Sequence, residues 1–368
     1  MRWLAIAVLG LLGCEASVPV PPLQTDAAAI ERQAQAFVEA LKPRRKGKPV
    51  IAIVVLNEGT EITDFLLPHA VLRRSGVAEV QAVAPRRGRV ELYPPAFAVE
   101  VTHDLTDFDR AHPAGADYVI VPRMVDDNPP AITAWLKRQA QRGARIIGVC
   151  AGVLVVGQAG LLDGRRFTTH WFYRGDILKR HPGAVYVPHQ RYVVDRGVAT
   201  TTGITASVPA MLALVEAIGG RPKAQALAAE LGVNSWTPAH DSSPFGLTAA
   251  RRWDYVLTTV AFWRRERWSV DVADGMDDVA LAFAADAWTR TGSVGIEASA
   301  SGPVKLRSGL VLLAKPAAQD APRMPLAPAL KPAQQLDRTL DEIAARFGTA
   351  RRERVMLELE YPGAALAR

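Results

Sequence analysis

Strongly apolar runs of strand length alternate with helix-like stretches through the middle of the chain. The runs occupy residues 50–56, 118–121 and 144–149. A strand covered on both faces of a parallel sheet has such a continuous apolar run. Between the last two runs, apolar residues recur at helical spacing up to Gly143, and a further apolar helix is predicted before Gly219-Gly220. This alternation predicts an α/β fold built on a doubly wound parallel sheet.

Polar and reactive residues follow the predicted strands. The loop at residues 57–64, the Pro122-Arg123 pair and Cys150 each come directly after an apolar run. In doubly wound sheets, ligands bind outside the carboxyl ends of the strands. We therefore expect these three segments to share a ligand site at one edge of the sheet.

Cys150 lies at a sharp turn between a predicted strand and a predicted helix. The segment Gly148-Val149-Cys150-Ala151-Gly152 has the form G-x-C-x-G, the pattern of a nucleophile elbow with cysteine in place of serine. Small flanking residues are needed because the nucleophile adopts a strained backbone conformation. The end of the following helix is expected to stabilise a thiolate. The alternative is a buried and unreactive thiol, which is common for a free cysteine.

Two longer stretches resemble the ThiJ/PfpI family of the class I glutamine-amidotransferase-like superfamily. They are residues 148–171 (GVCAGVLVVGQAGLLDGRRFTTHW) and residues 62–72 (ITDFLLPHAVL). Gly203 with the helix after it, and Ser243-Pro244-Phe245, also match the family's pattern. The resemblance covers about residues 48–247. It implies a flavodoxin-like fold and a reactive cysteine at the elbow, which corresponds to Cys150.

The resemblance also implies two partners for Cys150. Asp64 corresponds to an acid that is hydrogen-bonded to the thiol, and His170 corresponds to a nearby histidine that transfers a proton. Without the resemblance, Asp64 would be interpreted as a helix cap and His170 as a structural residue.

The chain departs from the family's pattern at two places that bear on catalysis. The family's Pro-Gly-Gly loop, whose backbone N–H groups can form an oxyanion hole, is Pro122-Arg123-Met124 here. The polar residue that often follows the nucleophile is replaced by Ala151. Arg123 either occludes the pocket or binds an anionic substrate. Together with Ala151 and Gly152, it forms the predicted substrate-binding or oxyanion group.

The last third of the chain resembles the first domain again, in part. Residues 277–292 align with residues 61–76 at a constant offset, and a hairpin-like pattern follows in both. The segment in which a second elbow cysteine would fall is replaced by a proline-rich linker, residues 315–332. We therefore predict a smaller, degenerate α+β partial repeat over residues 248–368, packed on the first domain as an internal pseudo-dimer. The alternatives are a conventional homodimer and an unrelated appendage.

The N-terminus predicts export. Residues 4–13 form an apolar run that is too short to span a bilayer but suits a secretory signal, and Cys14 follows it. Residues 1–14 resemble a bacterial lipobox segment, which implies lipidation of Cys14. A tether and an amphipathic helix are predicted over residues 15–47. We expect a lipid-anchored protein on the periplasmic face of a membrane, with a soluble periplasmic protein as the alternative.

Composition narrows the set of partners. The 368 residues include 44 Lys or Arg and 37 Asp or Glu, and a net charge of +7 is small for this length. No nucleic-acid partner is predicted from it. The sequence shows no zinc-binding pattern, phosphate-binding glycine loop or nucleotide fingerprint, so neither a metal nor a cofactor is expected.

Together these patterns predict an exported, Cys150-dependent enzyme that acts on a small electrophilic substrate. The resemblance suggests a hydratase, a glyoxalase or deglycase, or an amidase-like hydrolase, and it does not fix the reaction. The competing interpretation is a non-catalytic ligand-binding or redox-sensing module on the same fold.

Overall fold

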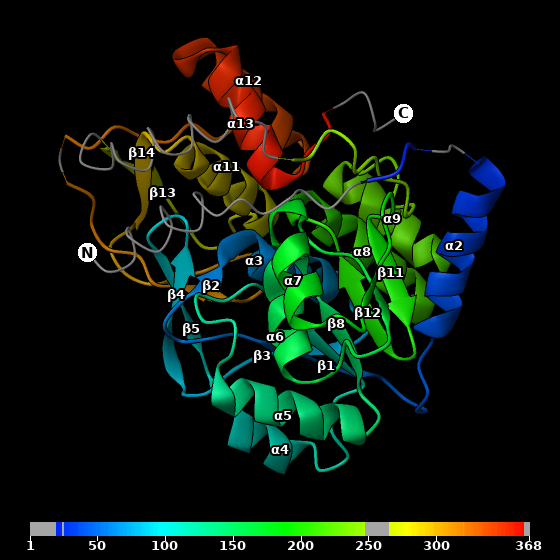
Figure 1. The fold of residues 1–368 in the computed structure, drawn as a ribbon. Coiled ribbons are helices and arrows are strands. Elements are labelled where there is room, and N and C mark those ends of the chain that lie inside the picture. Colours follow the sequence, from blue (N-terminus) through cyan, green and yellow to red (C-terminus); the bar gives the residue numbers. More distant parts are fainter. Residues whose placement is uncertain (1–19, 24–25, 247–264, 319, 364–368) are drawn as a thin grey trace.

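A mostly parallel sheet of seven strands forms the centre of the molecule (Figure 1). The computed structural model describes residues 20–23, 26–246, 265–318 and 320–363. The strand order is β11-β12-β8-β7-β1-β3-β6, and β11 alone runs antiparallel to its neighbour. These strands are β1 (Val50–Val54), β3 (Glu79–Ala84), β6 (His103–Asp104), β7 (Tyr118–Val121), β8 (Arg145–Gly148), β11 (Tyr192–Asp195) and β12 (Val198–Thr201). The predicted doubly wound α/β fold is confirmed.

Helices cover both faces of this sheet (Figure 1). On one face lie α4 (Leu105–Ala111) and α5 (Pro130–Gln141), and on the other lie α3 (Ile62–Ser75), α8 (Ser207–Gly219) and α9 (Arg221–Leu231). Helix α2 (Ala27–Ala40) packs against α8. The apolar runs are strands because both of their faces are covered: Ile51, Ala52, Ile53 and Val54 of β1 are completely buried.

The segment after Cys150 differs from the single apolar helix that the sequence predicts. It begins with a 3₁₀ turn, Cys150–Gly152, which continues into the short helix α6 (Val153–Gln158). The helix stops there because Gly160 takes a left-handed conformation (φ 70°). A further 3₁₀ turn (Trp171–Tyr173) and α7 (Arg174–Arg180) lie between β9 (Arg166–Phe167) and β10 (Val185–Tyr186), which form a small parallel pair.

A smaller α+β unit packs on the first domain, as predicted. Its strands β13 (Glu266–Asp271) and β14 (Val294–Ser299) are parallel, and its helices are α11 (Asp278–Arg290), α12 (Gln334–Phe347) and α13 (Thr349–Leu359). Helix α11 packs on α3. A second sheet joins the two parts in the order β15-β16-β5-β4-β2. Its strands are β2 (Thr60–Glu61), β4 (Gly88–Tyr93), β5 (Phe97–Val101), β15 (Val304–Lys305) and β16 (Val311–Leu312).

The last two helices of the small unit repeat a junction of the first domain. Gly220 joins α8 to α9 with φ 85° and ψ 160°, and Gly348 joins α12 to α13 with φ 86° and ψ 163°. In both pairs the second helix ends at a residue in the left-handed conformation, Gly232 and Glu360. These matches support the predicted partial repeat, which nevertheless stays a prediction.

Parts of the sequence interpretation lie outside the described residues. These are the signal segment, residues 1–14, with its Cys14, and the predicted domain boundary between residues 247 and 248. Among the helices that are described, none has the length and the apolar character needed to cross a membrane.

Candidate functional site

Cys150 occupies a strained elbow directly after β8. Its φ of 55° lies in the left-handed region, which residues other than glycine rarely adopt. Its backbone N–H donates to Thr201 Oγ1 (3.1 Å), and its carbonyl oxygen accepts from Thr169 Oγ1 (2.9 Å). The two hydroxyl groups hold the strained residue from either side. The predicted nucleophile elbow is therefore present in its backbone geometry.

Gly152 is required for the close approach of this turn to the neighbouring strand. A Cβ atom at Gly152 would lie 2.0 Å from the carbonyl oxygen of Val121, at the end of β7. The Gly152 N–H donates to the Val149 carbonyl (2.7 Å) inside the turn. The structure thus shows a steric requirement at Gly152 and an N–H that is engaged within the turn, whereas its predicted part in substrate binding or an oxyanion hole stays a prediction.

We expect Gly152→Ala to destabilise the protein by about 3 kcal/mol or more, because the new methyl group meets backbone rather than a movable side chain. The matched control is Gly295→Ala in β14, where no heavy atom lies within 4 Å of the added Cβ. That variant is expected to change stability by less than about 0.5 kcal/mol. Urea unfolding of both variants measures the difference, and equal stability changes would contradict this account of the turn.

Asp64 lies in the first turn of α3, next to the elbow. Its backbone N–H donates to the side chain of Glu61 (2.6 Å), so Glu61 rather than Asp64 caps this helix. The Asp64 carboxylate is completely buried, and its Oδ2 accepts from the Arg123 backbone N–H (3.2 Å). Burial raises the pKa of Asp64 well above its usual range, and the neighbouring Glu61 raises it further. Both effects favour the protonated form of the Asp64 carboxyl group, which interacts with the Cys150 thiol.

The electrostatic surroundings favour a neutral Cys150 thiol. Burial raises the pKa of Cys150 well above its usual range, and the carboxyl groups of Asp64 and Glu61 raise it further. The Ala151 N–H acts in the opposite direction and has the smaller effect. Burial and the acidic neighbours therefore oppose the expected stabilisation of a thiolate by the end of the six-residue helix, and that stabilisation stays a prediction.

His170 lies near Cys150, but both of its ring nitrogens have other partners. Nδ1 accepts from the Phe172 N–H (3.2 Å), which leaves the proton on Nε2, and Nε2 donates to the Glu358 carbonyl oxygen of α13 (3.0 Å). Burial lowers the pKa of His170, so the ring is neutral. Its position beside the site is as predicted, whereas its role in proton transfer stays a prediction.

Cys150 and His170 line one cavity of about 250 Å³. Its walls come from both parts of the molecule and consist of Glu61, Tyr93, Arg123, Cys150, Ala151, His170, Trp171, Phe172, Tyr173, Ile204, Arg290 and Glu358. Arg123 and Ala151 are thus at the site, as predicted. The Arg123 side chain lies over the Tyr173 ring, with Cζ 4.9 Å from the ring centroid. It lines the cavity and does not close it.

The residues that carry Cys150, Asp64 and His170 match a known protein family. The model of the DJ-1/PfpI family matches residues 50–217. These residues form a DJ-1/PfpI family domain. The predicted family membership is confirmed for this domain, whereas the comparisons do not test the second copy.

Individual relatives of the DJ-1/PfpI domain differ in what their names say they do. An isonitrile hydratase of Pseudomonas putida is 37% identical over 110 residues, which are 30% of this chain and 47% of that protein. The HTH-type transcriptional regulator CdhR of Pseudomonas aeruginosa is 35% identical over 86 residues, which are 23% of this chain and 25% of the regulator. The chain thus spans less than half the length of these curated relatives.

Solved structures are similar to part of this chain. Drosophila melanogaster DJ-1beta has a TM-score of 0.45 and 19% identity, and the match covers 50% of this chain and 98% of that one. A ThiJ/PfpI family protein from Pseudomonas syringae has a TM-score of 0.45 and 23% identity over 57% of this chain and 81% of that one.

The small unit supplies two charged residues to the pocket of the DJ-1/PfpI domain. Arg290, at the end of α11, contacts the carboxylates of Glu61 (2.9 Å), Asp286 (2.8 Å) and Glu358 (3.7 Å). Glu61 belongs to the first domain, so this guanidinium joins the two parts at the edge of the pocket. Sequence analysis missed Arg290 and Glu358. The only trace of this site in the sequence is the i,i+4 spacing of Asp286 and Arg290. That spacing predicts an ion pair within one helix and gives no sign of a contact with Glu61.

A second acidic residue of the small unit is fixed in the first domain. Glu360 Oε2 accepts from the backbone N–H groups of Gly203 (2.7 Å) and Trp171 (3.3 Å), and its Oε1 contacts His240 Nε2 (3.2 Å). Trp171 Nε1 also donates to the Leu357 carbonyl oxygen (2.8 Å). The end of α13 is therefore tied to the segment that carries His170.

The three carboxylates around Arg290 make stability depend on pH. Burial raises the pKa of Asp286 to about 8, whereas an exposed aspartate titrates near 3.9. Between these values the folded protein holds a proton that the unfolded chain has released, so stability falls as the pH rises from about 4 to about 8. We expect a loss on the order of 3 kcal/mol between pH 5 and pH 8, and Asp286→Asn should remove most of it.

Denaturant unfolding at several pH values measures this effect. Asp341→Asn is the control, because Asp341 is exposed on α12, and it should keep the wild-type pH dependence. An Asp286→Asn protein with the same slope as the wild type would contradict the assignment of the proton to Asp286.

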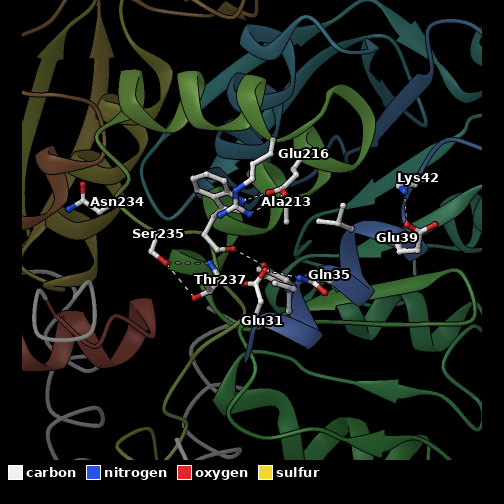
Figure 2. Close-up of a pocket in the computed structure, with 14 residues that line it drawn as sticks. Glu31, Gln35, Glu39, Lys42, Ala213, Glu216, Asn234, Ser235 and Thr237 are labelled. Atoms are coloured by element: carbon white, nitrogen blue, oxygen red, sulfur yellow. Dashed lines mark hydrogen bonds and ion pairs between the residues drawn. The ribbon is translucent and has the colours of Figure 1, made fainter. Parts of the chain in front are cut away.

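A separate cavity of about 420 Å³ lies between α2, α8 and the segment after α9 (Figure 2). Glu31, Gln35 and Glu216 are among its lining residues, and Glu216 accepts from Trp236 Nε1 (2.8 Å). None of the predicted site residues lines it. The chemistry that the sequence predicts therefore belongs to the smaller cavity at Cys150.

Proposed function

We propose that this protein is an enzyme that uses Cys150 as a nucleophile on a small electrophilic substrate. The observation that carries the proposal is the placement of the thiol. It lies at a strained elbow, on the wall of a cavity, beside the protonated carboxyl group of Asp64. A left-handed conformation at a non-glycine residue costs on the order of 1–3 kcal/mol, and such strain is concentrated at functional sites. A cysteine that only fills the core does not require it.

The neutral thiol and the neutral carboxyl group suit an addition reaction. With an isonitrile, the Cys150 sulfur bonds to the terminal carbon, and the thiol proton passes through Asp64 to the same carbon, giving a thioimidate. One water molecule then adds and the carbon–sulfur bond breaks. The products are a formamide and the regenerated thiol. Asp64 ends each cycle as it began, since it takes up and releases one proton.

The choice of substrate class rests on two supports. The cavity of about 250 Å³ is small, which favours a compact molecule. A relative of the DJ-1/PfpI domain carries the name isonitrile hydratase, and hydration of that group fits the addition described above. Aldehydes and amides present a carbonyl carbon that a thiol also attacks, so glyoxalase, deglycase and amidase reactions belong to the same proposal.

The competing function is a ligand-binding or sensing module. The neutral thiol favours it, and so do the transcriptional regulators among the relatives. Through those relatives DNA also becomes a possible partner, in contrast to the expectation from charge alone. Export with a lipid on Cys14 stays a prediction from residues 1–14.

Turnover of a substrate panel tests the proposal. The purified full-length chain is incubated with small isonitriles, 2-oxoaldehydes and primary amides, products are followed by NMR, and the protein is examined by intact mass spectrometry. We expect turnover of at least one class and a transient adduct on Cys150. Binding of panel members with neither turnover nor adduct would favour the sensing module instead.

A further inference from the structure

The Cys150 pocket is lined by two hydrogen-bond donors for which the described residues supply no acceptor. They are the guanidinium group of Arg123 and the hydroxyl group of Tyr93, and both residues line the cavity. We propose that this pair binds a carboxylate, so that the ligand of the pocket is a small carboxylic acid anion. This inference rests on the proposed function for the identity of the reacting centre, and it adds the chemical class of the substrate.

Arg123 is held in place by packing and has no counter-ion. Its guanidinium lies over the ring of Tyr173, and within the described part of the chain it forms no ion pair or side-chain hydrogen bond. Asp127, the nearby acid, is paired with Arg180 (2.6 Å) instead. A guanidinium that faces a cavity without an acceptor matches a carboxylate, which it can bind through two parallel hydrogen bonds.

Tyr93 supplies the second donor. Its hydroxyl oxygen is buried and has no hydrogen-bond partner among the described residues. An unpaired buried hydroxyl is unfavourable unless a ligand or an ordered water satisfies it. Tyr93 ends β4 and is paired with Glu61 of β2 across the second sheet, so its position is fixed by the backbone. Tyr93, Arg123 and Cys150 line the same cavity, so both donors belong to the pocket that contains the reacting sulfur.

The acidic residues of the pocket do not neutralise Arg123, because they have their own cations. Glu61 and Glu358 both contact Arg290, and Glu358 also contacts Arg354 (3.1 Å). The Asp64 carboxyl group is protonated. Arg123 is therefore left as the positive charge available to a ligand, and a carboxylate bound there brings an adjacent electrophilic carbon towards Cys150.

Binding of propanoate and propanamide tests this inference, since the two molecules have the same shape and differ in charge. NMR titration of the full-length protein is expected to give propanoate an affinity at least about ten times higher than propanamide. Arg123→Met should abolish the difference, and Tyr93→Phe should reduce it. Arg89→Met, at an exposed position on the same strand as Tyr93, is the control and should leave it unchanged.

Equal affinities for the two probes, or failure of both to bind, would overturn the inference. So would a preference for propanoate that survives Arg123→Met. Propanamide belongs to the amide class of candidate substrates, so both probes are also titrated into the Cys150→Ser protein, in which binding is measured independently of turnover. A protein that prefers propanoate and turns over no substrate would lose the proposed function and keep the carboxylate site.

Discussion

Replacing Cys150 with serine is expected to lower kcat/KM by about a thousand-fold or more. The sulfur is the atom that bonds to the substrate, and a serine hydroxyl at this position is far less acidic and less nucleophilic. The described residues place no free base beside it, since both ring nitrogens of His170 are engaged and Asp64 is protonated. Steady-state kinetics on the substrate found in the panel measure the loss.

The serine variant also needs a control for folding and for cysteine chemistry elsewhere. Cys14 is the only other cysteine of the sequence, and Cys14→Ser should leave kcat/KM unchanged. Cys150→Ser should unfold within about 1 kcal/mol of the wild type, because the two side chains have similar volume. A Cys150→Ser protein that retains a tenth of the wild-type activity would rule out covalent catalysis by this residue.

Arg290→Met is expected to destabilise the protein by about 3–5 kcal/mol. The change removes the one guanidinium that contacts Glu61, Asp286 and Glu358, while the methionine keeps most of the apolar volume. Three carboxyl groups then remain at a buried position without this cation. The loss should grow with pH, because burial already raises the pKa of Glu61 and Asp286, and both would then have to ionise without the Arg290 cation. Urea unfolding at pH 6 and pH 8 provides the measurement.

A matched arginine on the surface separates this effect from the loss of any ion pair. Arg338, on α12, contacts Glu342 (2.8 Å) at an exposed position, and Arg338→Met should cost about 0.5 kcal/mol or less. If Arg290→Met and Arg338→Met lowered the free energy of unfolding equally, the packing of the small unit on the DJ-1/PfpI domain would not depend on the Arg290 guanidinium.

The pattern of apolar residues was sufficient to predict the central strands and the fold class. The runs at residues 50–56, 118–121 and 144–149 became central strands because a doubly wound sheet covers both of their faces. The ends of the helices did not follow from the pattern. The helix after Cys150 is shorter than its apolar run, because the 3₁₀ turn precedes it and Gly160 ends it. A pattern of apolar residues gives the burial of a segment and not the conformation of its first turn.

The site was predictable to the extent that its residues follow strands. Cys150 and Arg123 were placed at the site because carboxyl ends of parallel strands meet at one edge, whereas the roles of Asp64 and His170 came only from the resemblance to the ThiJ/PfpI family. Arg290 could not be found this way, because its contact with Glu61 joins residues 229 positions apart and exists only once α11 packs on α3. The raised pKa of the thiol could not be predicted for a related reason. The helix end is visible in the sequence, whereas the burial of Asp64 and Glu61 beside the sulfur is a tertiary property.

The rate of alkylation of Cys150 by iodoacetamide, measured against pH on the folded protein, tests the central claim most directly. A nucleophile on the wall of an open cavity should react without unfolding, and its rate should keep rising above pH 9, because burial and the neighbouring acids raise the pKa of the thiol. A thiol that reacts only when the protein unfolds would show Cys150 to be an inert core residue and would contradict the account.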